Sequence, residues 1–229
     1  MEEALKHRFL PKTVYHSPAL LSDRGVKLVG QFAAAEVATV EVSARQFRAV
    51  ADTKTPQGIL GVFDQPDTDI EELFRTNHRR VLLCESVADP GNLGTLARSA
   101  LAFGFKTMLL TGSSADPYSP KVVRSSAGAV FGLRIGWVSR ERLFELVTRH
   151  GFKLVASSTS GTRDIALLEA IIRSGRLILA IGAEADGLTK EVIEHSDLQW
   201  RIDHDSAAES LNAAVAGSII MKQVYDNWR

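Results

Sequence analysis

The pattern of apolar and polar positions along the chain changes near residue 68. Before that point, short β-type runs at 13–16, 39–42 and 58–63 alternate with helical patterns at 18–34 and 43–51. The polar, proline-containing stretch 64–69 then separates two differently patterned regions, as a linker does. We therefore predict a small α/β module over residues 1–68 and a second domain over residues 69–229.

The second domain is predicted to contain a parallel β-sheet. Its apolar runs lie at 81–84, 107–110, 133–138, 153–157, 177–181 and 198–202. Several are continuously apolar, which is typical of strands covered on both faces. Helical patterns at 93–103, 139–150 and 211–225 indicate βαβ crossovers. Ligands bind beyond the carboxyl ends of the strands in such sheets, so chemistry is expected directly after each run.

Composition excludes some classes of protein. The N-terminal residues have no apolar signal segment, and no run approaches the roughly 18 apolar residues of a membrane span, so we predict a cytoplasmic protein with no membrane partner. The single cysteine, Cys84, excludes a disulfide framework and a multi-cysteine metal site. Because it sits in the apolar run 81–84, we expect a buried, inert thiol.

Overall charge gives no information on a polyanionic partner, because Lys plus Arg and Asp plus Glu are both 27. Local charge is more informative, since residues 120–150 contain six basic residues against two acidic ones. The basic residues are Lys121, Arg124, Arg134, Arg140, Arg142 and Arg149. This excess suits contact with phosphate, and the alternative is a solvated helix face of mixed charge.

The first candidate motif follows the run 81–84 and extends to Arg98. Asn92 is predicted to cap a helix, and Arg98 lies four residues beyond Gly94, where backbone could approach a ligand closely. The G-x-G-x-x-G spacing and a Walker lysine are absent, which disfavours a nicotinamide or ATP enzyme. Taken alone, Asn92 is a cap and Arg98 an exposed helix arginine.

Two further motifs follow later strands. Residues 182–188 place Gly182 and Gly187 around Glu184, which permits a tight turn whose amides face a ligand. In the segment 209–217, Ser210 or Asn212 can cap a helix whose small residues allow close packing. Taken separately, each is also explained as an ordinary turn or helix start.

Together the three segments resemble the three motifs of the SpoU (TrmH-like) family of RNA 2′-O-ribose methyltransferases, in the SPOUT superfamily. The resemblance rests on Asn92 and Arg98, on the glycine and Glu184 of the second segment, and on the Ser210-Leu211-Asn212 helix start. Residues 121–129 resemble the segment between the first two motifs, and residues 55–59 the end of the family's N-terminal RNA-binding module. Family members with this module usually begin with a longer segment, which implies a shortened module here.

The resemblance implies a fold that composition could not suggest, because true knots are nearly absent from proteins. The stretch 177–225 is expected to thread a deep trefoil knot, and the protein is expected to be a homodimer joined through this domain, with sites that draw on both chains. The implied cofactor is S-adenosyl-L-methionine, and no metal is required. The implied cofactor-binding residues are Ser157, Thr159, Gly182, Glu184, Gly187, Leu188, Ile202 and Leu211.

The resemblance also implies the catalytic residues, which are Arg98, Asn92, Glu184, Ser210 and Asn212. Arg98 is assigned as electrostatic stabiliser and positioner, because the high pKa of arginine conflicts with a role as base. Lys121 and Arg124 are the expected RNA contacts, with ribosomal RNA favoured over tRNA. A non-catalytic RNA-binding protein of the same fold is the rival interpretation.

Two histidine patterns are given structural interpretations. Three consecutive residues, Asp203-His204-Asp205, cannot converge on a metal from one strand, so a solvated loop is preferred. His195 follows a helical pattern and is expected near a helix C-terminus.

Overall fold

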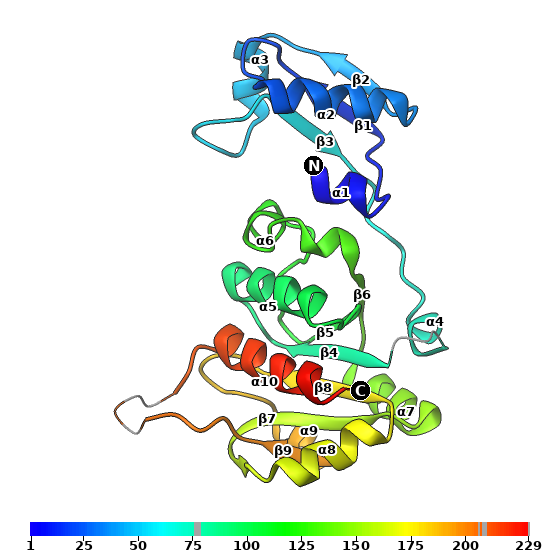
Figure 1. The fold of residues 1–229 in the computed structure, drawn as a ribbon, viewed down its shortest axis with the longest axis vertical. Coiled ribbons are helices and arrows are strands. Elements are labelled where there is room, and N and C mark those ends of the chain that lie inside the picture. The colour runs from blue at the N-terminus through cyan, green and yellow to red at the C-terminus, as the bar shows by residue number, and fades with distance from the viewer. Residues whose placement is uncertain (76–78, 206, 208–209, 229) are drawn as a thin grey trace. The chain divides into compact units, whose positions relative to one another are not determined.

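The computed structural model describes residues 1–229 except 76–78, 206, 208–209 and 229. The chain divides into two compact units, Met1–Asp67 and Thr68–Arg229 (Figure 1). Among the described residues, no helix is both long and apolar enough to cross a membrane.

The first unit is a three-stranded sheet with helices. Strand β1 (Thr13–His16) lies in the centre, parallel to β2 (Ala38–Glu41) and antiparallel to β3 (Ile59–Val62). Its helices are α1 (Glu2–Lys6), α2 (Asp23–Ala34) and α3 (Ala44–Val50). Val14 packs with Leu28 and Phe32 of α2 in a small core. The predicted α/β pattern of this module is confirmed, although α2 begins five residues later than the pattern at 18–34 indicates.

The second unit contains a six-stranded, fully parallel sheet. Its strands are β4 (Arg80–Glu85), β5 (Thr107–Thr111), β6 (Arg134–Trp137), β7 (Lys153–Thr162), β8 (Leu177–Ile181) and β9 (Leu198–Trp200). They lie in the order β6-β5-β4-β8-β7-β9, and every neighbouring pair is parallel. All six predicted runs are confirmed as strands, and their carboxyl ends share one edge of the sheet.

Helices cover both faces of this sheet. They are α4 (Ile70–Arg75), α5 (Pro90–Ala102), α6 (Pro120–Ser125), the 3-10 helix η1 (Ala129–Gly132), α7 (Arg140–His150), α8 (Ile165–Arg173), α9 (Lys190–Glu194) and α10 (Ala213–Asn227). Leu82 and Cys84 of β4 pack in the core under α5 and α10, while Val81 and Leu83 pack in the core under α4 and α7. Burial on both faces explains the continuous apolar runs. Cys84 is fully buried and burial raises the pKa of its thiol, which confirms the expected inert thiol.

Helix α5 begins earlier than the sequence pattern predicts. Its N-cap is Asp89, whose carboxylate accepts a hydrogen bond from the Asn92 amide at 2.8 Å. Pro90 occupies the first helical position, where no amide hydrogen is needed. The prediction that Asn92 caps this helix is therefore wrong, and its side chain is left available for another contact.

Small residues set the spacing of the helices around α5. A Cβ atom at Gly94 would lie 1.9 Å from Ser125 Oγ of α6, and one at Gly217 would lie 2.5 Å from Leu96 Cδ2. Gly94 thus serves close helix packing, and the expectation that backbone meets a ligand there is wrong. The small residues of α10 pack closely on α5, as predicted, and Ser99 and Ser218 join the two helices by a 2.7 Å hydrogen bond.

Candidate cofactor and RNA site

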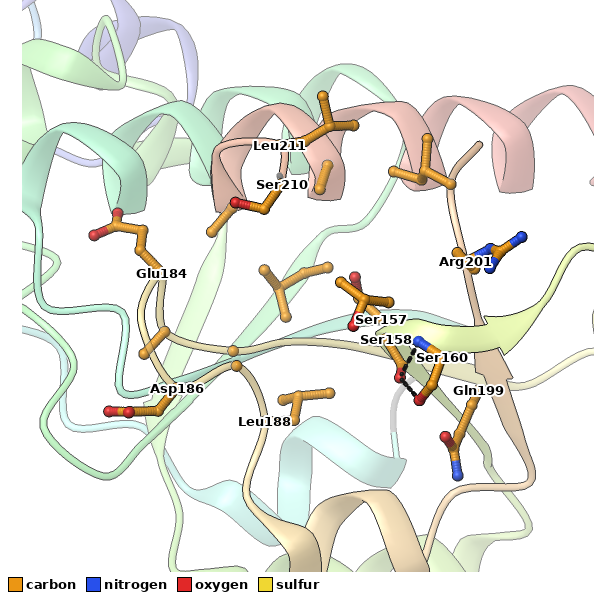
Figure 2. A pocket seen from close by; sticks show the side chains of 18 of the residues that line it. Ser157, Ser158, Ser160, Glu184, Asp186, Leu188, Gln199, Arg201, Ser210 and Leu211 are labelled. Atoms are coloured by element: carbon orange, nitrogen blue, oxygen red, sulfur yellow. Dashed lines mark hydrogen bonds between the residues drawn. The ribbon is translucent and has the colours of Figure 1, made fainter. Parts of the chain in front are cut away.

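The carboxyl edge of the sheet contains a cavity of about 310 Å³. Its wall is formed mainly by residues 157–160 of β7, by residues of the turn after β8 and by residues between β9 and the start of α10 (Figure 2). The last group consists of Gln199, Arg201, Ile202, His204, Ser210, Leu211, Ala213 and Ala216, and Ile193 of α9 completes the wall. Both Ser157 and Thr162 pair with Trp200 of β9, so the residues between them bulge out of the ladder. This bulge lets residues 158–160 reach the cavity.

All eight residues predicted to bind the cofactor line this cavity. They are Ser157, Thr159, Gly182, Glu184, Gly187, Leu188, Ile202 and Leu211. Ser210, predicted as catalytic, also lies in the wall. Residues separated by more than 50 positions in sequence therefore meet at the edge of the sheet where the βαβ pattern predicts ligand binding.

The turn after β8 requires glycine at two positions. Ala183 and Gly187 exchange two backbone hydrogen bonds, of 3.1 and 3.0 Å, which close the turn. A Cβ atom at Gly182 would lie 2.2 Å from the carbonyl carbon of Gly187, and Gly187 itself has a φ of +67°. The turn holds Glu184 and Asp186 on one side of the cavity, across from Gln199 and Arg201 (Figure 2). Neither carboxylate has a hydrogen bond or ion pair with another described residue.

The first and third motifs touch directly. Asn212 caps α10, and its Oδ1 accepts hydrogen bonds from the amides of Ala214 and Val215 at 2.9 and 3.2 Å. This leaves its Nδ2 to donate to Asn92 Oδ1 at 3.0 Å. Asn212 follows Ser210 and Leu211 of the cavity wall, so the contact places the start of α5 beside the cavity. Glu209, the first residue of this motif segment, lies outside the described residues.

Arg98 lies apart from the cavity wall. It is exposed on α5, and it makes no hydrogen bond or ion pair with any residue that the structure describes. Lys121 of α6 lies 3.8 Å from the Asp89 carboxylate, and Arg124 is likewise not without a partner. The structure therefore brings Asn92, Glu184, Ser210 and Asn212 together, and leaves Arg98, Lys121 and Arg124 outside the cavity.

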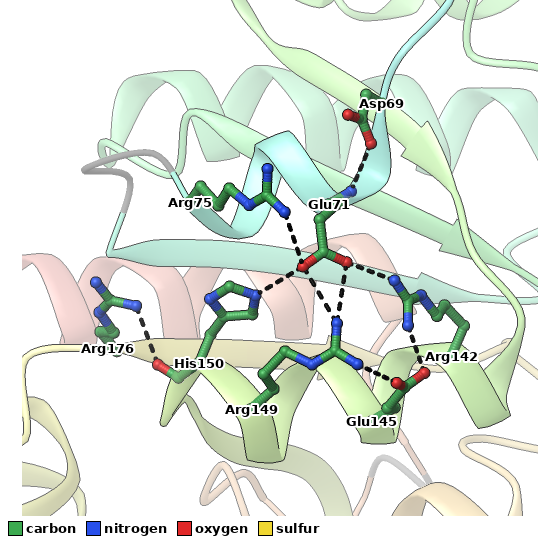
Figure 3. A network of polar contacts seen from close by, with 8 residues as sticks. All are labelled: Asp69, Glu71, Arg75, Arg142, Glu145, Arg149, His150 and Arg176. Carbon is green, nitrogen blue, oxygen red and sulfur yellow. Dashed lines mark hydrogen bonds and ion pairs between the residues drawn. The ribbon is translucent and has the colours of Figure 1, made fainter.

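Most of the basic stretch 120–150 is neutralised by carboxylates. Arg134 pairs with Glu72 at 2.9 Å, and Arg140 pairs with Glu85 at 2.6 Å. Arg142 and Arg149 both pair with Glu71 and Glu145 (Figure 3). The local excess of positive charge counted along the sequence is therefore largely paired in the fold, and Lys121, a residue predicted to contact RNA, also lies 3.8 Å from a carboxylate, that of Asp89.

Glu71 is the centre of this cluster, whose other members are Arg75, Arg142, Glu145, Arg149 and His150 (Figure 3). Burial by itself would raise the pKa of Glu71. The hydrogen bond from His150 and the charges of Arg149 and Arg142 outweigh burial and lower the pKa. The cluster joins α4 to α7 on the side of the sheet away from α10.

The sequence patterns did not single out Glu85, at the end of β4. Its side chain is 1% exposed and accepts hydrogen bonds from Arg140 Nε, from the Thr189 amide at 2.8 Å and from the Thr189 hydroxyl at 3.0 Å. The hydrogen bond from Arg140 to Glu85 raises the pKa of this arginine. The sequence did contain one signal for Glu85, a charged residue at the end of an apolar run. A carboxylate buried at such a place needs hydrogen-bond partners from other segments.

The cavity wall also contains polar residues outside the predicted set. They are Ser158, Ser160, Asp186, Gln199, Arg201 and His204. His204 belongs to the predicted loop, where its neighbour Asp203 pairs with Arg163 at 2.7 Å. His195 is the C-cap of α9 and stacks on Phe144 at 3.9 Å, which confirms its predicted place.

Comparison with known proteins identifies the family. The SpoU rRNA Methylase family matches residues 79–222, which include all three motifs. The chain belongs to this family. A relative, the 23S rRNA (guanosine(2553)-2′-O)-methyltransferase RlmP of Bacillus subtilis, is 33% identical over 175 residues, which cover 76% of this chain and 67% of that protein.

Two other similar proteins extend the likeness to the first unit. The uncharacterized tRNA/rRNA methyltransferase slr1673 of Synechocystis is 30% identical and covers 89% of this chain and 73% of its own length. The crystal structure of an AdoMet-bound rRNA methyltransferase from Sinorhizobium meliloti has a TM-score of 0.83 at 26% identity, over 97% of this chain and 82% of that chain. The likeness to these methyltransferases thus extends over both units.

Proposed function

We propose that this SpoU family member transfers a methyl group from S-adenosyl-L-methionine to a ribose 2′-hydroxyl of ribosomal RNA. The observation that carries the proposal is the meeting of the three motifs at one place, where the Asn92–Asn212 hydrogen bond adjoins a cavity that contains Glu184 and Ser210. The relative RlmP is named for this reaction on 23S rRNA, and the Sinorhizobium relative for its bound cofactor.

The cavity suits the cofactor in size and in chemistry. A volume of about 310 Å³ lies at the small end of ligand sites, which span roughly 300–1,000 Å³. At Gly182 any side chain would collide with the Gly187 backbone, so the wall stays thin and backbone groups can face a ligand. Glu184 and Asp186 supply negative charge for the sulfonium and ammonium groups, and Arg201 supplies positive charge for the carboxylate. When bound, the cofactor supplies a methyl group activated by the sulfonium charge.

The residues of this chain act on the attacking oxygen. The ribose 2′-hydroxyl is a weak acid, so negative charge develops on its oxygen as it attacks, and the Arg98 guanidinium stabilises that charge. Because arginine stays protonated, the proton passes to an RNA phosphate or to water. Asn92, Asn212, Ser210 and Glu184 orient the ribose beside the cavity. Such positioning contributes up to roughly 7–11 kcal/mol of barrier reduction in well-oriented reactions.

A homodimer accounts for the place of Arg98. Arg98 is exposed on α5 outside the cavity wall of its own chain, and α10, packed on α5, exposes Val215, Ile219 and Tyr225. Burial of these apolar side chains against a second copy would stabilise a dimer. In that arrangement Arg98 of one protomer faces the cavity of its partner, and each site is completed by both chains through the knotted region that the family implies.

The first unit is proposed to hold the RNA. Arg45 and Arg48 of α3 and Lys54 of the following loop are exposed within ten residues of one another. Closely spaced cations of this kind bind the phosphate backbone without reading sequence. This unit would therefore strengthen RNA binding, while the second unit carries the chemistry.

The test is methyl transfer from labelled cofactor to in vitro transcribed ribosomal RNA, followed by mapping of the alkali-resistant linkage that a 2′-O-methyl group creates. A parallel reaction with transcribed tRNA tests the rival substrate. We expect label in ribosomal RNA at one alkali-resistant position. Label in tRNA alone would show that the substrate is tRNA and not ribosomal RNA. Label in a base would refute ribose methylation.

Calorimetric titration with S-adenosyl-L-methionine separates the enzyme from an RNA-binding scaffold of the same fold. We expect saturable binding with one cofactor per cavity. A properly folded protein that binds RNA but gives no heat with the cofactor would be a scaffold.

A further inference from the structure

A second hollow lies at the same edge of the sheet, beyond the carboxyl ends of β5 and β6. It has a volume of about 420 Å³ and is lined by Thr111, Gly112, Trp137, Val138, Ser139, Arg140 and Glu141. None of these residues belongs to the three motifs. Because β6, β5, β4 and β8 are consecutive neighbours, the hollow lies two to three strand spacings, roughly 10–14 Å, from the turn that follows β8.

Trp137 is the aromatic residue among those that line this hollow. It is 49% exposed, whereas Trp200 is 3% exposed. Side chains alternate along a strand, so Trp137 lies on the same face as Ile135, which packs in the core under α5. Trp137 follows the last core position of β6, so part of its ring is left in contact with solvent. An aromatic face of this kind stacks on nucleic-acid bases regardless of their sequence.

Arg140 gives the hollow an oriented cation. Its Nε donates to Glu85 Oε1 at 2.6 Å, and that carboxylate is buried and held by Thr189. The two Nη groups of Arg140 make no hydrogen bond with any described residue, and the side chain is 32% exposed. A guanidinium fixed through Nε presents its remaining donors as a fork, which matches a phosphate group.

We propose that Trp137 and Arg140 form a subsite for a nucleotide of the RNA substrate other than the methylated one, with its base stacked on Trp137 and its phosphate on Arg140. The inference rests on the proposed function, because it takes the ligand to be the RNA whose ribose lies beside the cofactor cavity. Glu141 lines the same hollow, and its negative charge opposes phosphate binding. Replacement of Glu141 by a neutral residue should therefore strengthen RNA binding.

The first test compares Trp137→Ala with Trp137→Phe. RNA affinity is measured without cofactor by filter binding of in vitro transcribed large-subunit ribosomal RNA, and KM for the same RNA is measured in methyl transfer. We expect Trp137→Ala to weaken both by about tenfold, as loss of one stacked base does, and Trp137→Phe to restore most of the loss. The matched control is Leu167→Ala, another half-exposed apolar residue, which lies on α8 outside both cavities and should change neither value.

The second test uses Glu141→Gln, because removal of Arg140 would leave Glu85 as a buried, unpaired charge and threaten folding. We expect Glu141→Gln to tighten RNA binding by about twofold to threefold at low salt, with a smaller gain at high salt. The opposite signs expected for Trp137→Ala and Glu141→Gln distinguish a nucleotide subsite from a general loss of folding.

The outcomes separate this subsite from the proposed function. If the wild-type protein methylates RNA but Trp137→Ala binds it unchanged, the subsite is wrong and the function stands. If the wild-type protein transfers no methyl group, the function fails, and filter binding still tests the subsite. If Trp137→Ala changes the sedimentation coefficient and leaves RNA affinity unchanged, the surface is a protein interface and the proposal is overturned.

Discussion

The cofactor cavity and the Glu71 cluster belong to the same domain but use charge in opposite ways. Around Glu71, each of Arg75, Arg142 and Arg149 meets a carboxylate, and His150 hydrogen-bonds to Glu71, so these groups satisfy one another and join α4 to α7. In the cavity, Glu184 and Asp186 have no ionic partner among the described residues. The difference indicates how a ligand site is best recognised. Charged side chains without a protein partner at the edge of a sheet are a better sign than a high local count of basic residues.

The largest effect expected from this comparison is at Arg98, which is also without a described partner. Arg98→Ala should lower kcat by about 10²–10³-fold, as loss of one stabilising donor does, while the Kd for S-adenosyl-L-methionine stays within twofold. Single-turnover methyl transfer and calorimetry measure the two quantities. Arg173→Ala is the matched control, because that arginine is exposed on α8 and pairs with Glu169. Equal losses of turnover and cofactor affinity would place Arg98 in the cofactor pocket instead.

The next effect is expected at the glycine turn of the cavity. Gly182→Ala would place a Cβ atom 2.2 Å from the Gly187 carbonyl carbon, so the turn must open. Overpacking of this kind costs about 1–3 kcal/mol, and we expect cofactor affinity to fall by roughly 10-fold to 100-fold. The control is Gly30→Ala on α2, where nothing lies within 4 Å of the added atom. Unchanged cofactor affinity in a folded Gly182→Ala protein would remove this turn from the binding site.

Much of the sheet was predictable because its strands are buried on both faces. Continuous apolar runs such as 177–181 leave few alternatives to a central strand. Helix α8 was missed because Ile165 and Leu167 are exposed while Leu168 and Ile172 are buried, so apolar residues on both faces blur the helical period. The cap at Asp89 was missed because Asn92 has the same propensity, and only the fold shows which side chain reaches the free amide.

Part of the cavity wall was predictable in its members, but its arrangement was not. Resemblance to the family supplied the eight residues that the structure places around one cavity. Each of them ends or follows a predicted strand or begins a predicted helix. The bulge in β7 and the three hydrogen bonds to Glu85 depend on pairing between distant segments, which no local pattern contains. The same reason explains why the partners of Arg142 and Arg149 could not be read from the count of basic residues.

A third prediction concerns the stability that the Glu71 cluster provides. A carboxyl group whose folded pKa lies below its ordinary value of about 4.5 stabilises the protein above that pH, and this stability is lost as pH falls through the folded pKa. Glu71→Gln should therefore lower Tm at pH 7, and its difference from the wild type should shrink as pH falls below about 4.5. Glu145→Gln, in the same cluster but more exposed, should lower Tm less. A difference in Tm that stays constant from pH 7 to pH 3 would show that charge pairing is not its cause.

The smallest expected effect is on RNA binding by the paired arginines. Arg149 interacts with Glu71 and Glu145, so phosphate would have to compete with two carboxylates for it. Arg149→Gln should change RNA affinity by less than about twofold, since an exposed charge that is already paired adds little. The filter-binding assay that tests Trp137→Ala measures this directly, with the same transcribed ribosomal RNA at two salt concentrations. A loss of fivefold or more that disappears at high salt would mean that this cluster opens to receive phosphate, and the contrast between the paired and the unpaired charges would no longer hold.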